Sequence, residues 1–257
     1  MTMVNPGTTG LVGYFALNEV SGDAVDSHGG NNFVETNGAI ASVAGLVGNA
    51  RDFEKDNNRY FLGGNVAALK LTDAVTFNFW VNPELAGLQA PIFWNQSAGK
   101  GLSVWFSATM KAYLSINGNA RATGTTTIPT AEWSMITTTY NKDAGGTTEA
   151  KVYVNGALDA EGDYSTAVVY DATASFRIGR DLNGSYDYDG LMQHFSVWSV
   201  ALSADNCEWL YNTGSGRAYA SLSGIPKIKT INGITMAQTK TISGISVASI
   251  KSVQGIS

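Results

Sequence analysis

The sequence predicts an all-β protein in which two antiparallel sheets pack into a sandwich, with one short helix and a short β-rich tail. Three observations favour this fold class. Short runs of alternating apolar and polar residues extend from about residue 11 to 216, and Gly, Asn, Asp and Thr separate them, as in antiparallel sandwiches. One segment has the start and stop signals of a helix. The last 36 residues repeat with a period of 11 residues.

The strands of the body are predicted from this alternation, because successive side chains of a strand point to opposite faces. One strand places Phe77, Phe79 and Val81 on one face, and another places Val152 and Val154 on one face before a turn. The other predicted strands are residues 13–17, 51–53, 92–94, 102–106, 112–116, 134–140, 176–179 and 190–198. This number of strands is enough for two packed sheets.

One helix is predicted, over residues 204–211. Ser203 supplies an N-cap, Asp205 lies near the positive end of the helix dipole, and Gly214 follows the last turn. The apolar face of this helix consists of Cys207, Leu210 and Tyr211. The body is therefore expected to end near the helix, so that residues 1–216 form one domain.

The tail, residues 217–257, carries the repeats behind a predicted linker at residues 217–223. Gly233, Gly244 and Gly255 are spaced by 11 residues, and each follows a polar residue that closes a β-branched run. Such polar-Gly pairs, above all Asn-Gly, are strong signals for tight hairpin turns. We therefore predict short strands joined by tight turns.

A helical interpretation of the tail is the alternative, because an 11-residue period also suits a right-handed helical supercoil. A glycine in every unit and Pro226 oppose this alternative. A segment of this length seldom buries enough apolar surface to fold alone. The tail is thus expected to pack on something else, as an anchoring or oligomerisation element.

Charge, cysteine content and the N-terminus argue against several classes of protein. The net charge is −5, the pI is near 5.0 and the 16 basic residues are scattered, which argues against a nucleic-acid surface. Cys207 is the one cysteine, so an intrachain disulfide and a cysteine metal cluster are excluded. Residues 1–7 lack the features of a secretory signal, and no later segment is apolar enough to span a membrane. The chain is expected to fold in the compartment where it is made.

Several groups of segments in the body follow one another in a recognisable order. They are residues 11–22 with 26–27, 48–53 with 59–60, 77–83, 133–140 with 151–157, 176–180 with 188–190, and 195–203 leading into 209–212. This order resembles that of laminin-G-like domains of the concanavalin A-like lectin/glucanase superfamily. The resemblance covers nearly the whole body and implies that the two sheets form a jelly roll.

The resemblance does not extend to a calcium site. Many relatives have an acidic pair just after the glycine that corresponds to Gly190, whereas this sequence has Gln193 and His194 there. Asp26 and Asp189 remain as oxygen donors, but calcium takes six to eight oxygen ligands, and no dense acidic loop supplies them. We therefore expect no cofactor and no metal, with a structural calcium ion as the alternative to solvated carboxylates.

The sequence does not predict an enzyme. Glycoside hydrolysis needs two carboxylates at a defined separation, and glucanases of the superfamily carry them in a Glu-x-Asp-x-x-Glu pattern that is absent here. Asp52 and Glu54 are spaced to share a strand face, which equally fits an exposed strand edge. His28 and His194 do not define a nucleophile with its base.

Sugar binding by sandwich lectins usually combines an aromatic ring with side chains that hydrogen-bond to hydroxyl groups, and two stretches offer this combination. Trp94 precedes two amide residues, and the polar loop of residues 181–189 carries Tyr186, Asp187 and Tyr188. These four residues are the predicted carbohydrate-binding residues. Packing is the alternative, because aromatic residues also fill cores. Packing is predicted for Trp80, Trp105, Trp133 and Trp198.

The tail units, of the type Ile/Val-Lys-x-Ile-Asn-Gly, resemble repeats that end many bacteriophage virion proteins. This resemblance implies a capsid decoration, fibre or tail-associated protein, assembled in the host cytoplasm and located on the virion. Residues 217–257 would bind other virion proteins or sister subunits, and the lectin-like body would bind surface glycans, with neither nucleic acid nor membrane as a partner. The alternatives are a free or cell-surface bacterial lectin and a purely architectural cement protein.

Overall fold

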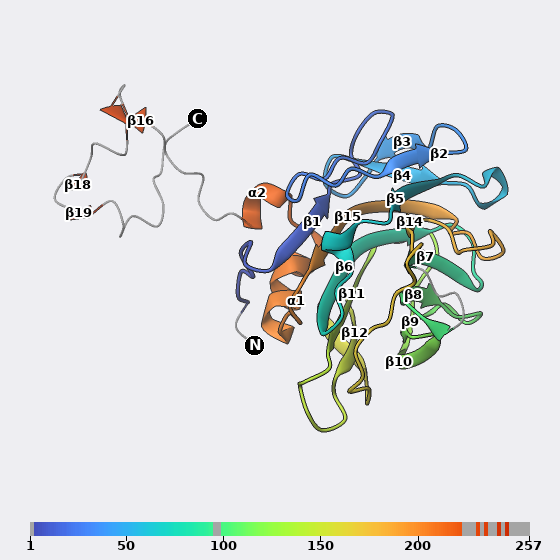
Figure 1. The fold of residues 1–257 in the computed structure, drawn as a ribbon. Helices are drawn as coiled ribbons and strands as arrows, with labels where there is room; N and C mark the ends of the chain where they lie inside the picture. Colours follow the sequence, from blue (N-terminus) through green and yellow to red (C-terminus); the bar gives the residue numbers. More distant parts are fainter. Residues whose placement is uncertain are drawn as a thin grey trace.

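The protein is an antiparallel β-sandwich (Figure 1). The computed structural model describes residues 3–94 and 99–222, together with tail segments 230–231, 234–235, 241–242 and 245–246. The predicted all-β fold of two packed sheets is confirmed. No helix in the described part of the chain has the length and apolar character needed to cross a membrane.

Seven strands of the eight-stranded sheet have the order β13-β12-β11-β6-β15-β4-β3. The eighth strand, β1, pairs with β15. Its strands are β1 (Leu11–Phe15), β3 (Ala41–Ala44), β4 (Asn49–Phe53), β6 (Ala74–Pro83), β11 (Ser134–Asn141), β12 (Ala150–Val154), β13 (Ala157–Gly162) and β15 (Gly190–Trp198). Neighbours such as β6 and β15 are far apart in sequence, because the chain crosses repeatedly between the two sheets, as in a jelly roll.

The seven-stranded sheet has the order β10-β9-β8-β7-β14-β5-β2. Its strands are β2 (Val34–Thr36), β5 (Tyr60–Gly64), β7 (Gln89–Trp94), β8 (Leu102–Phe106), β9 (Lys111–Ile116), β10 (Asn119–Thr127) and β14 (Phe176–Ile178). At one side of the sandwich, the Asp159 carboxylate of β13 accepts hydrogen bonds from the backbone N–H groups of Thr125 (3.0 Å) and Thr126 (3.1 Å) in β10. These bonds join the edges of the two sheets.

The main core lies between the sheets, and β6 shows how the sequence builds it. Phe77, Phe79 and Val81 point inward and are at most 1% exposed, which confirms the predicted apolar face. Trp80 points to the opposite face, where it belongs to a second apolar cluster. Strand β6 is therefore buried on both faces.

Helix α1 (Ala204–Tyr211) covers part of the outer face of the eight-stranded sheet. The Ser203 side chain accepts a hydrogen bond from the Asn206 backbone N–H, and the Asn206 side chain accepts one from the Ser203 N–H, so a capping box fixes the first turn. The Tyr211 ring stacks on Trp80, with 5.7 Å between ring centroids. The predicted helix and its N-cap are confirmed. Short 3₁₀ helices occur at η1 (Lys55–Asn57), η2 (Ala67–Leu69) and η4 (Asn212–Gly214).

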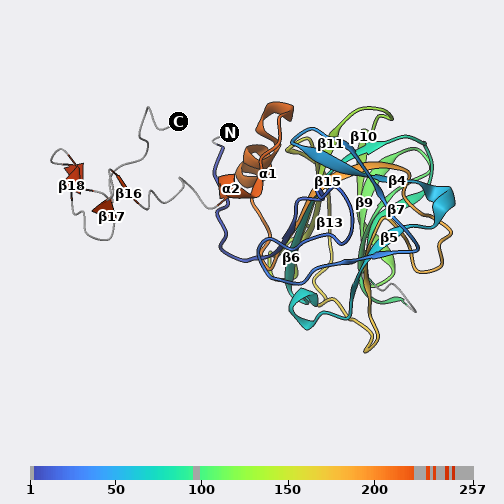
Figure 2. The same cartoon turned by 90° about the horizontal axis from the view of Figure 1, so that it is seen from above.

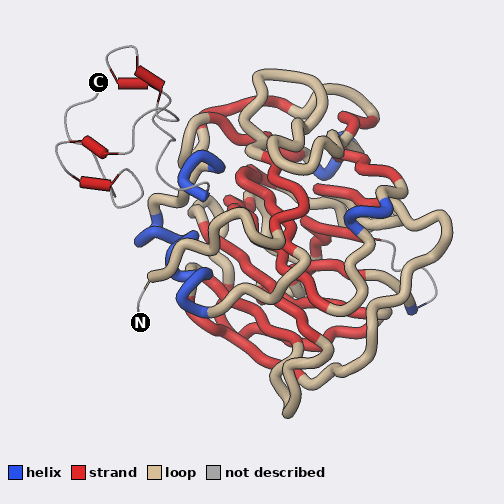
Figure 3. The backbone as a smooth tube through the Cα atoms, turned by 60° about the vertical axis from the view of Figure 1, so that its left-hand side comes forward, coloured by secondary structure: helices blue, strands red, loops and turns tan. Residues whose placement is uncertain are grey.

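The segment predicted as a linker packs on the body instead. Helix α2 (Tyr219–Leu222) follows α1, and the two lie on the same side of the sandwich as the N-terminus (Figures 2 and 3). The Tyr219 ring lies 5.0 Å from the ring of Tyr14, and Leu222 is 2% exposed. Helix α2 is a single turn held by these contacts with the body, and the local sequence pattern does not predict such contacts.

The tail contains two short hairpins in its described segments. Strand β16 (Thr230–Ile231) pairs with β17 (Ile234–Thr235), and β18 (Thr241–Ile242) pairs with β19 (Ile245–Ser246), both antiparallel. Each pair is separated by two residues, and the second pair follows the first by the 11-residue period of the sequence. These pairs confirm the predicted strands in two repeats, whereas the glycines and the third repeat lie outside the described residues.

Candidate functional site

Trp94 lies in the core between the sheets and has no exposed surface. Its ring packs edge-to-face against Phe176 of β14, with 4.7 Å between centroids, and lies 4.9 Å from the ring of Tyr170. A sugar cannot reach a ring in this position, which corrects the expectation of a stacking platform at Trp94. The amide residues that follow, Asn95 and Gln96, lie outside the described residues.

Tyr188 is also a core residue, with 1% of its surface exposed. Its hydroxyl group donates a hydrogen bond to the Leu191 carbonyl oxygen at 2.9 Å, and its ring meets Phe53 and Phe106 edge-on. Burial raises the pKa of the Tyr188 hydroxyl well above its usual value. The structure therefore places Tyr188 in packing and corrects its expected contact with a sugar.

Asp187 lies beneath the loop surface and is 2% exposed. One carboxylate oxygen is 3.3 Å from a guanidinium nitrogen of Arg180, so the two residues form a buried ion pair. Burial raises the pKa of Asp187 to about 6, and the Arg180 charge opposes that rise. Asp187 thus faces Arg180 inside the loop, away from solvent.

Tyr186 is the predicted residue that reaches solvent, with 41% of its surface exposed. Its backbone is fixed on both sides: the carbonyl accepts a hydrogen bond from the Ala90 N–H at 2.8 Å, and its N–H donates to the Asp181 carboxylate at 3.3 Å. The same carboxylate oxygen accepts the Ser185 N–H at 2.9 Å. The loop therefore presents the Tyr186 ring in a defined position.

The Tyr186 ring joins an aromatic cluster on the outer face of the seven-stranded sheet. Trp105 of β8 meets Tyr186 edge-on at 5.8 Å between centroids, and it stacks on Tyr113 of β9 with an interplanar angle of 6°. Phe93 of β7 meets Trp105 edge-on at 6.0 Å between centroids, and Leu88 packs beside them. We call Tyr186, Trp105, Tyr113, Phe93 and Leu88 the aromatic platform.

Local sequence explains how these rings come together. Trp105 and Tyr113 are directly opposite each other in the antiparallel pair of β8 and β9, and their rings share one face, since side chains alternate along each strand. The Trp105 indole N–H donates to the Ser103 hydroxyl oxygen at 2.7 Å, which fixes the ring orientation. Thr123 of β10, opposite Tyr113, adds an exposed residue with a hydroxyl group.

Asp26 is used as a structural anchor. Its carboxylate oxygens accept hydrogen bonds from the backbone N–H groups of Tyr14, His28, Gly29 and Asn31 at 2.9 to 3.0 Å. These four bonds use most of the lone pairs of the carboxylate. The residue organises the turn after β1 and has little capacity left for a metal ion.

Gln193 and His194, at the positions where the resemblance implies an acidic pair, form hydrogen bonds to uncharged groups. The Gln193 side-chain oxygen accepts the Leu46 N–H at 3.1 Å, and His194 Nδ1 lies 2.6 Å from the Tyr14 hydroxyl. Burial lowers the pKa of His194 to about 4, so this imidazole is neutral near pH 7. These residues do not fit a calcium site.

The described residues contain one close group of acidic side chains. Carboxylate oxygens of Asp52, Glu54 and Glu84 lie within 4.8 Å of one another, and Asp189 is close enough to repel each of them. Their pKa values are raised, first by burial and then by this mutual repulsion. Asp52 and Glu54 are close in sequence, whereas Glu84 follows β6 and joins them because β6 and β4 both pair with β15.

The family of the chain follows from this fold and from a comparison of sequences. The family model Laminin_G_3, of the concanavalin A-like lectin/glucanases superfamily, matches residues 55–207. The chain belongs to this family. No curated protein matches the sequence.

Solved structures with similar folds come from several kinds of protein. Domain 4 of AbnA, an extracellular GH43 arabinanase from Geobacillus stearothermophilus solved with arabinotriose, has a TM-score of 0.57 and 19% identity, over 77% of this chain and 96% of that domain. The binding domain of Paraclostridial Mosquitocidal Protein 1 has a TM-score of 0.61 and 15% identity, over 80% of this chain and 52% of its own.

The binding domain of botulinum neurotoxin DC, solved in complex with SialylT, has a TM-score of 0.57 and 12% identity over 79% of this chain. The present chain covers 51% of that domain, so it spans about half the length of the toxin binding domains it resembles. At these identities the likeness concerns the fold alone.

Proposed function

We propose that the body is a non-catalytic carbohydrate-binding domain that contacts glycans at the aromatic platform. The observation that carries the proposal is Tyr186: an exposed ring, fixed through its backbone, that lies against Trp105, which in turn stacks on Tyr113. An aromatic surface with a few nearby polar groups suits the apolar face and the hydroxyl groups of a sugar ring. Thr123 supplies such a hydroxyl group beside the platform.

Two similar structures support this assignment of ligand class. Domain 4 of AbnA was solved with arabinotriose, and the neurotoxin binding domain was solved with SialylT. Membership of the lectin/glucanases superfamily agrees with a saccharide ligand. The proposal of a non-catalytic role rests on the absence from this sequence of the Glu-x-Asp-x-x-Glu pattern.

We further propose that the protein is a bacteriophage virion protein, with the repeats as its anchor and the body displayed. The support is the resemblance of the repeats together with the two hairpins spaced by one 11-residue unit. Isolated two-stranded hairpins are marginally stable in water, so the tail hairpins need a sheet on another virion protein or on sister subunits. Many displayed copies would give avidity even if each site binds weakly.

The test of glycan binding compares Tyr186→Ala with the wild-type chain on a panel that includes arabinotriose and sialylated oligosaccharides. Loss of the exposed ring is expected to weaken binding at least tenfold, which corresponds to about 1.4 kcal/mol. Leu182→Ala is the matched control, because Leu182 lies in the same loop and is 38% exposed. Equal binding by wild type and Tyr186→Ala would show that the platform is not the site.

The cellular assignment needs a separate test. Antibodies against the body should label purified phage particles, and deletion of the repeats should remove the label. If the protein is found free or on the bacterial surface, the alternative of a bacterial lectin is correct. Release of reducing ends from glucans by the wild-type chain, and its loss in Glu84→Gln, would contradict the non-catalytic role.

A further inference from the structure

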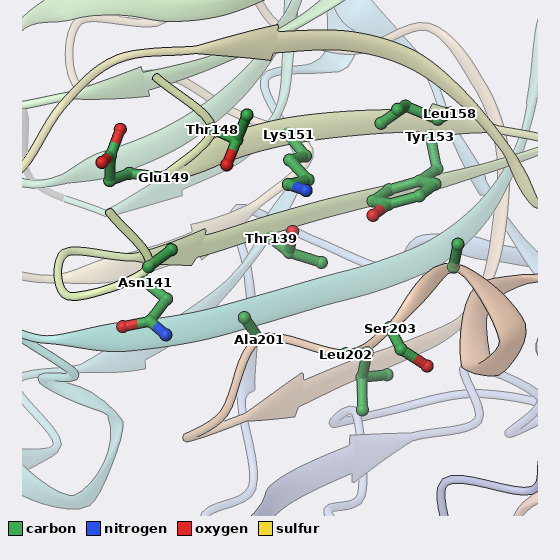
Figure 4. A pocket seen from close by; sticks show the side chains of 12 residues that line it. Thr139, Asn141, Thr148, Glu149, Lys151, Tyr153, Leu158, Ala201, Leu202 and Ser203 are labelled. Carbon is green, nitrogen blue, oxygen red and sulfur yellow. The ribbon is translucent and has the colours of Figure 1, made fainter. Parts of the chain in front are cut away.

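An open cleft lies on the outer face of the eight-stranded sheet (Figure 4). The aromatic platform lies on the outer face of the other sheet. Its volume is about 360 Å³. The floor consists of side chains from β11, β12 and β13, one wall is the loop after β11, and the other wall is the connection from β15 to α1. The residues used below are Thr139, Thr148, Lys151, Tyr153, Leu158 and Ala201.

The walls of the cleft are held in place by hydrogen bonds. On one side, the Glu149 carbonyl accepts the Asn141 N–H at 2.9 Å, and the Glu149 carboxylate accepts the Tyr164 N–H at 3.2 Å. On the other side, the Thr76 hydroxyl donates to the Val200 carbonyl at 2.7 Å and accepts the Leu202 N–H at 2.9 Å. The cleft is therefore formed before any ligand arrives, which lowers the entropic cost of binding.

The two charged side chains that line the cleft, Lys151 and Glu149, already have partners within the protein. Lys151 and Glu161 are directly opposite each other on β12 and β13, and their charged groups are 2.9 Å apart. Glu149 is 3% exposed and already holds the Tyr164 N–H. An anion gains little here because Lys151 is already paired with Glu161, and a cation gains little because Glu149 is buried, so the site favours a neutral ligand.

The uncharged part of the lining combines hydroxyl groups with apolar surface. Thr148 presents a hydroxyl group, whereas Leu158, Ala201 and the Tyr153 ring form apolar walls (Figure 4). Thr139, which is 2% exposed, lies on the floor and forms a side-chain hydrogen bond with Tyr153. A volume near the lower end of the usual range for ligand pockets suits a small molecule. A neutral compound with hydroxyl groups on its edge and apolar C–H faces matches this lining.

We propose that the cleft is a second saccharide site, specific for a neutral mono- or disaccharide. The inference shares the ligand class with the proposed function but places binding on the other sheet. With one site on each outer face, a single domain can bridge two glycan chains, so that cross-linking needs no oligomer.

Amide chemical shifts of the full chain test the proposal. Glucose, galactose, N-acetylglucosamine and lactose are each added to about 10 mM, where a site with a millimolar Kd is mostly occupied. At least one of them is expected to shift the amide signals of Lys151, Tyr153 and Leu158. The absence of shifts at these residues with all four sugars would overturn the proposal.

Two alanine-to-tryptophan variants test whether the sugar binds in the cleft or whether any added tryptophan changes the shifts. Ala201→Trp fills the cleft from an exposed wall residue. The sugar affinity measured from the amide shifts is expected to fall at least tenfold in this variant. Ala172→Trp, at an exposed position outside the cleft, should leave them unchanged. Shifts that survive in Ala201→Trp would refute the cleft as the site.

The Tyr186→Ala variant distinguishes failure of this inference from failure of the proposed function. Shifts in the cleft are expected to persist in this variant, whereas shifts at the aromatic platform disappear. If sugars shift platform signals alone, the proposed function stands and the second site is wrong. If Tyr186→Ala abolishes the cleft shifts as well, the two sites are not independent and the proposal of a second site fails.

Discussion

The two outer faces of the sandwich differ in what covers them. The outer face of the eight-stranded sheet is covered in part by α1 and α2, over a cluster that includes Trp80, Met135 and Trp198, and the open cleft lies on the uncovered part. The outer face of the seven-stranded sheet instead carries the small aromatic platform, where Tyr186 remains 41% exposed. The part of a face that is covered by helices contributes stability, whereas the parts left open, here the aromatic platform and the cleft, are available for ligands.

The largest effect is expected beneath the helix. Trp80→Ala removes a ring that is 2% exposed and stacked on Tyr211, and such truncations cost about 3 to 5 kcal/mol of unfolding free energy. Trp105→Ala on the other face should cost less, because its neighbours lie near solvent and water can fill the space. Urea denaturation of both variants measures the difference. Equal losses would mean that the two faces contribute alike to stability.

A pH effect is expected at His194, in the interior strand β15 of the eight-stranded sheet. The unfolded chain takes up a proton on His194 near pH 6.5, whereas the folded protein resists protonation down to about pH 4 because the imidazole is buried. Between these values the unfolded state binds more protons, so stability falls as the pH falls, by up to about 3 kcal/mol.

The control for this pH effect is His194→Asn. His194 has a φ of 52°, and asparagine tolerates this left-handed conformation better than most residues. The variant should lose much of the decline in melting temperature between pH 6.5 and 4, whatever its stability at pH 7. An unchanged decline would assign the pH effect to other groups.

A smaller effect on stability is expected at the platform. Tyr186→Ala should change the unfolding free energy by less than about 1 kcal/mol, because much of its ring is exposed and its backbone bonds to Ala90 and Asp181 remain. Loss of glycan binding without loss of stability would sharpen the contrast between the two faces. A loss comparable to that of Trp80→Ala would show that Tyr186 is a packing residue.

The smallest effect on the stability of the body is expected from removing the tail. Truncation after Leu222 keeps α2, whose contacts with Tyr14 belong to the body, and should leave the melting temperature of the body unchanged. Light scattering should show that the full chain forms a defined oligomer and that the truncated chain is a monomer. If the full chain and the truncated chain are both monomers, self-assembly through the repeats is contradicted.

The sequence predicted the strands that alternate clearly and missed those that do not. Strand β8 and helix α1 have the predicted bounds, because their apolar periodicity is unambiguous. The short strands β2, β3 and β5 were missed. Strands β10 and β13 were also missed, since both are rich in polar or small residues and lack a continuous apolar face. They are strands because β9 and β12 pair with them and Asp159 joins their edges.

The candidate site was predicted only in part. The loop with Tyr186 was recognised from its composition, but Trp94 and Tyr188 belong to the core. Trp105 was correctly expected to pack, although it packs on the outer face beside Tyr186. Alternation shows that Trp105 and Val104 point to opposite faces, but it does not show which face is the outer one.

The sequence by itself determined the local structures: the alternating strands, the capped helix α1 and the paired strands of two tail repeats. Only the tertiary structure decided which rings are exposed and where the acidic side chains meet. The reason is physical: periodicity depends on neighbours in the chain, whereas burial depends on elements that pack from distant parts of it. Trp94 and Tyr186 are both aromatic residues of predicted binding segments, and the packing of the two sheets alone separates them.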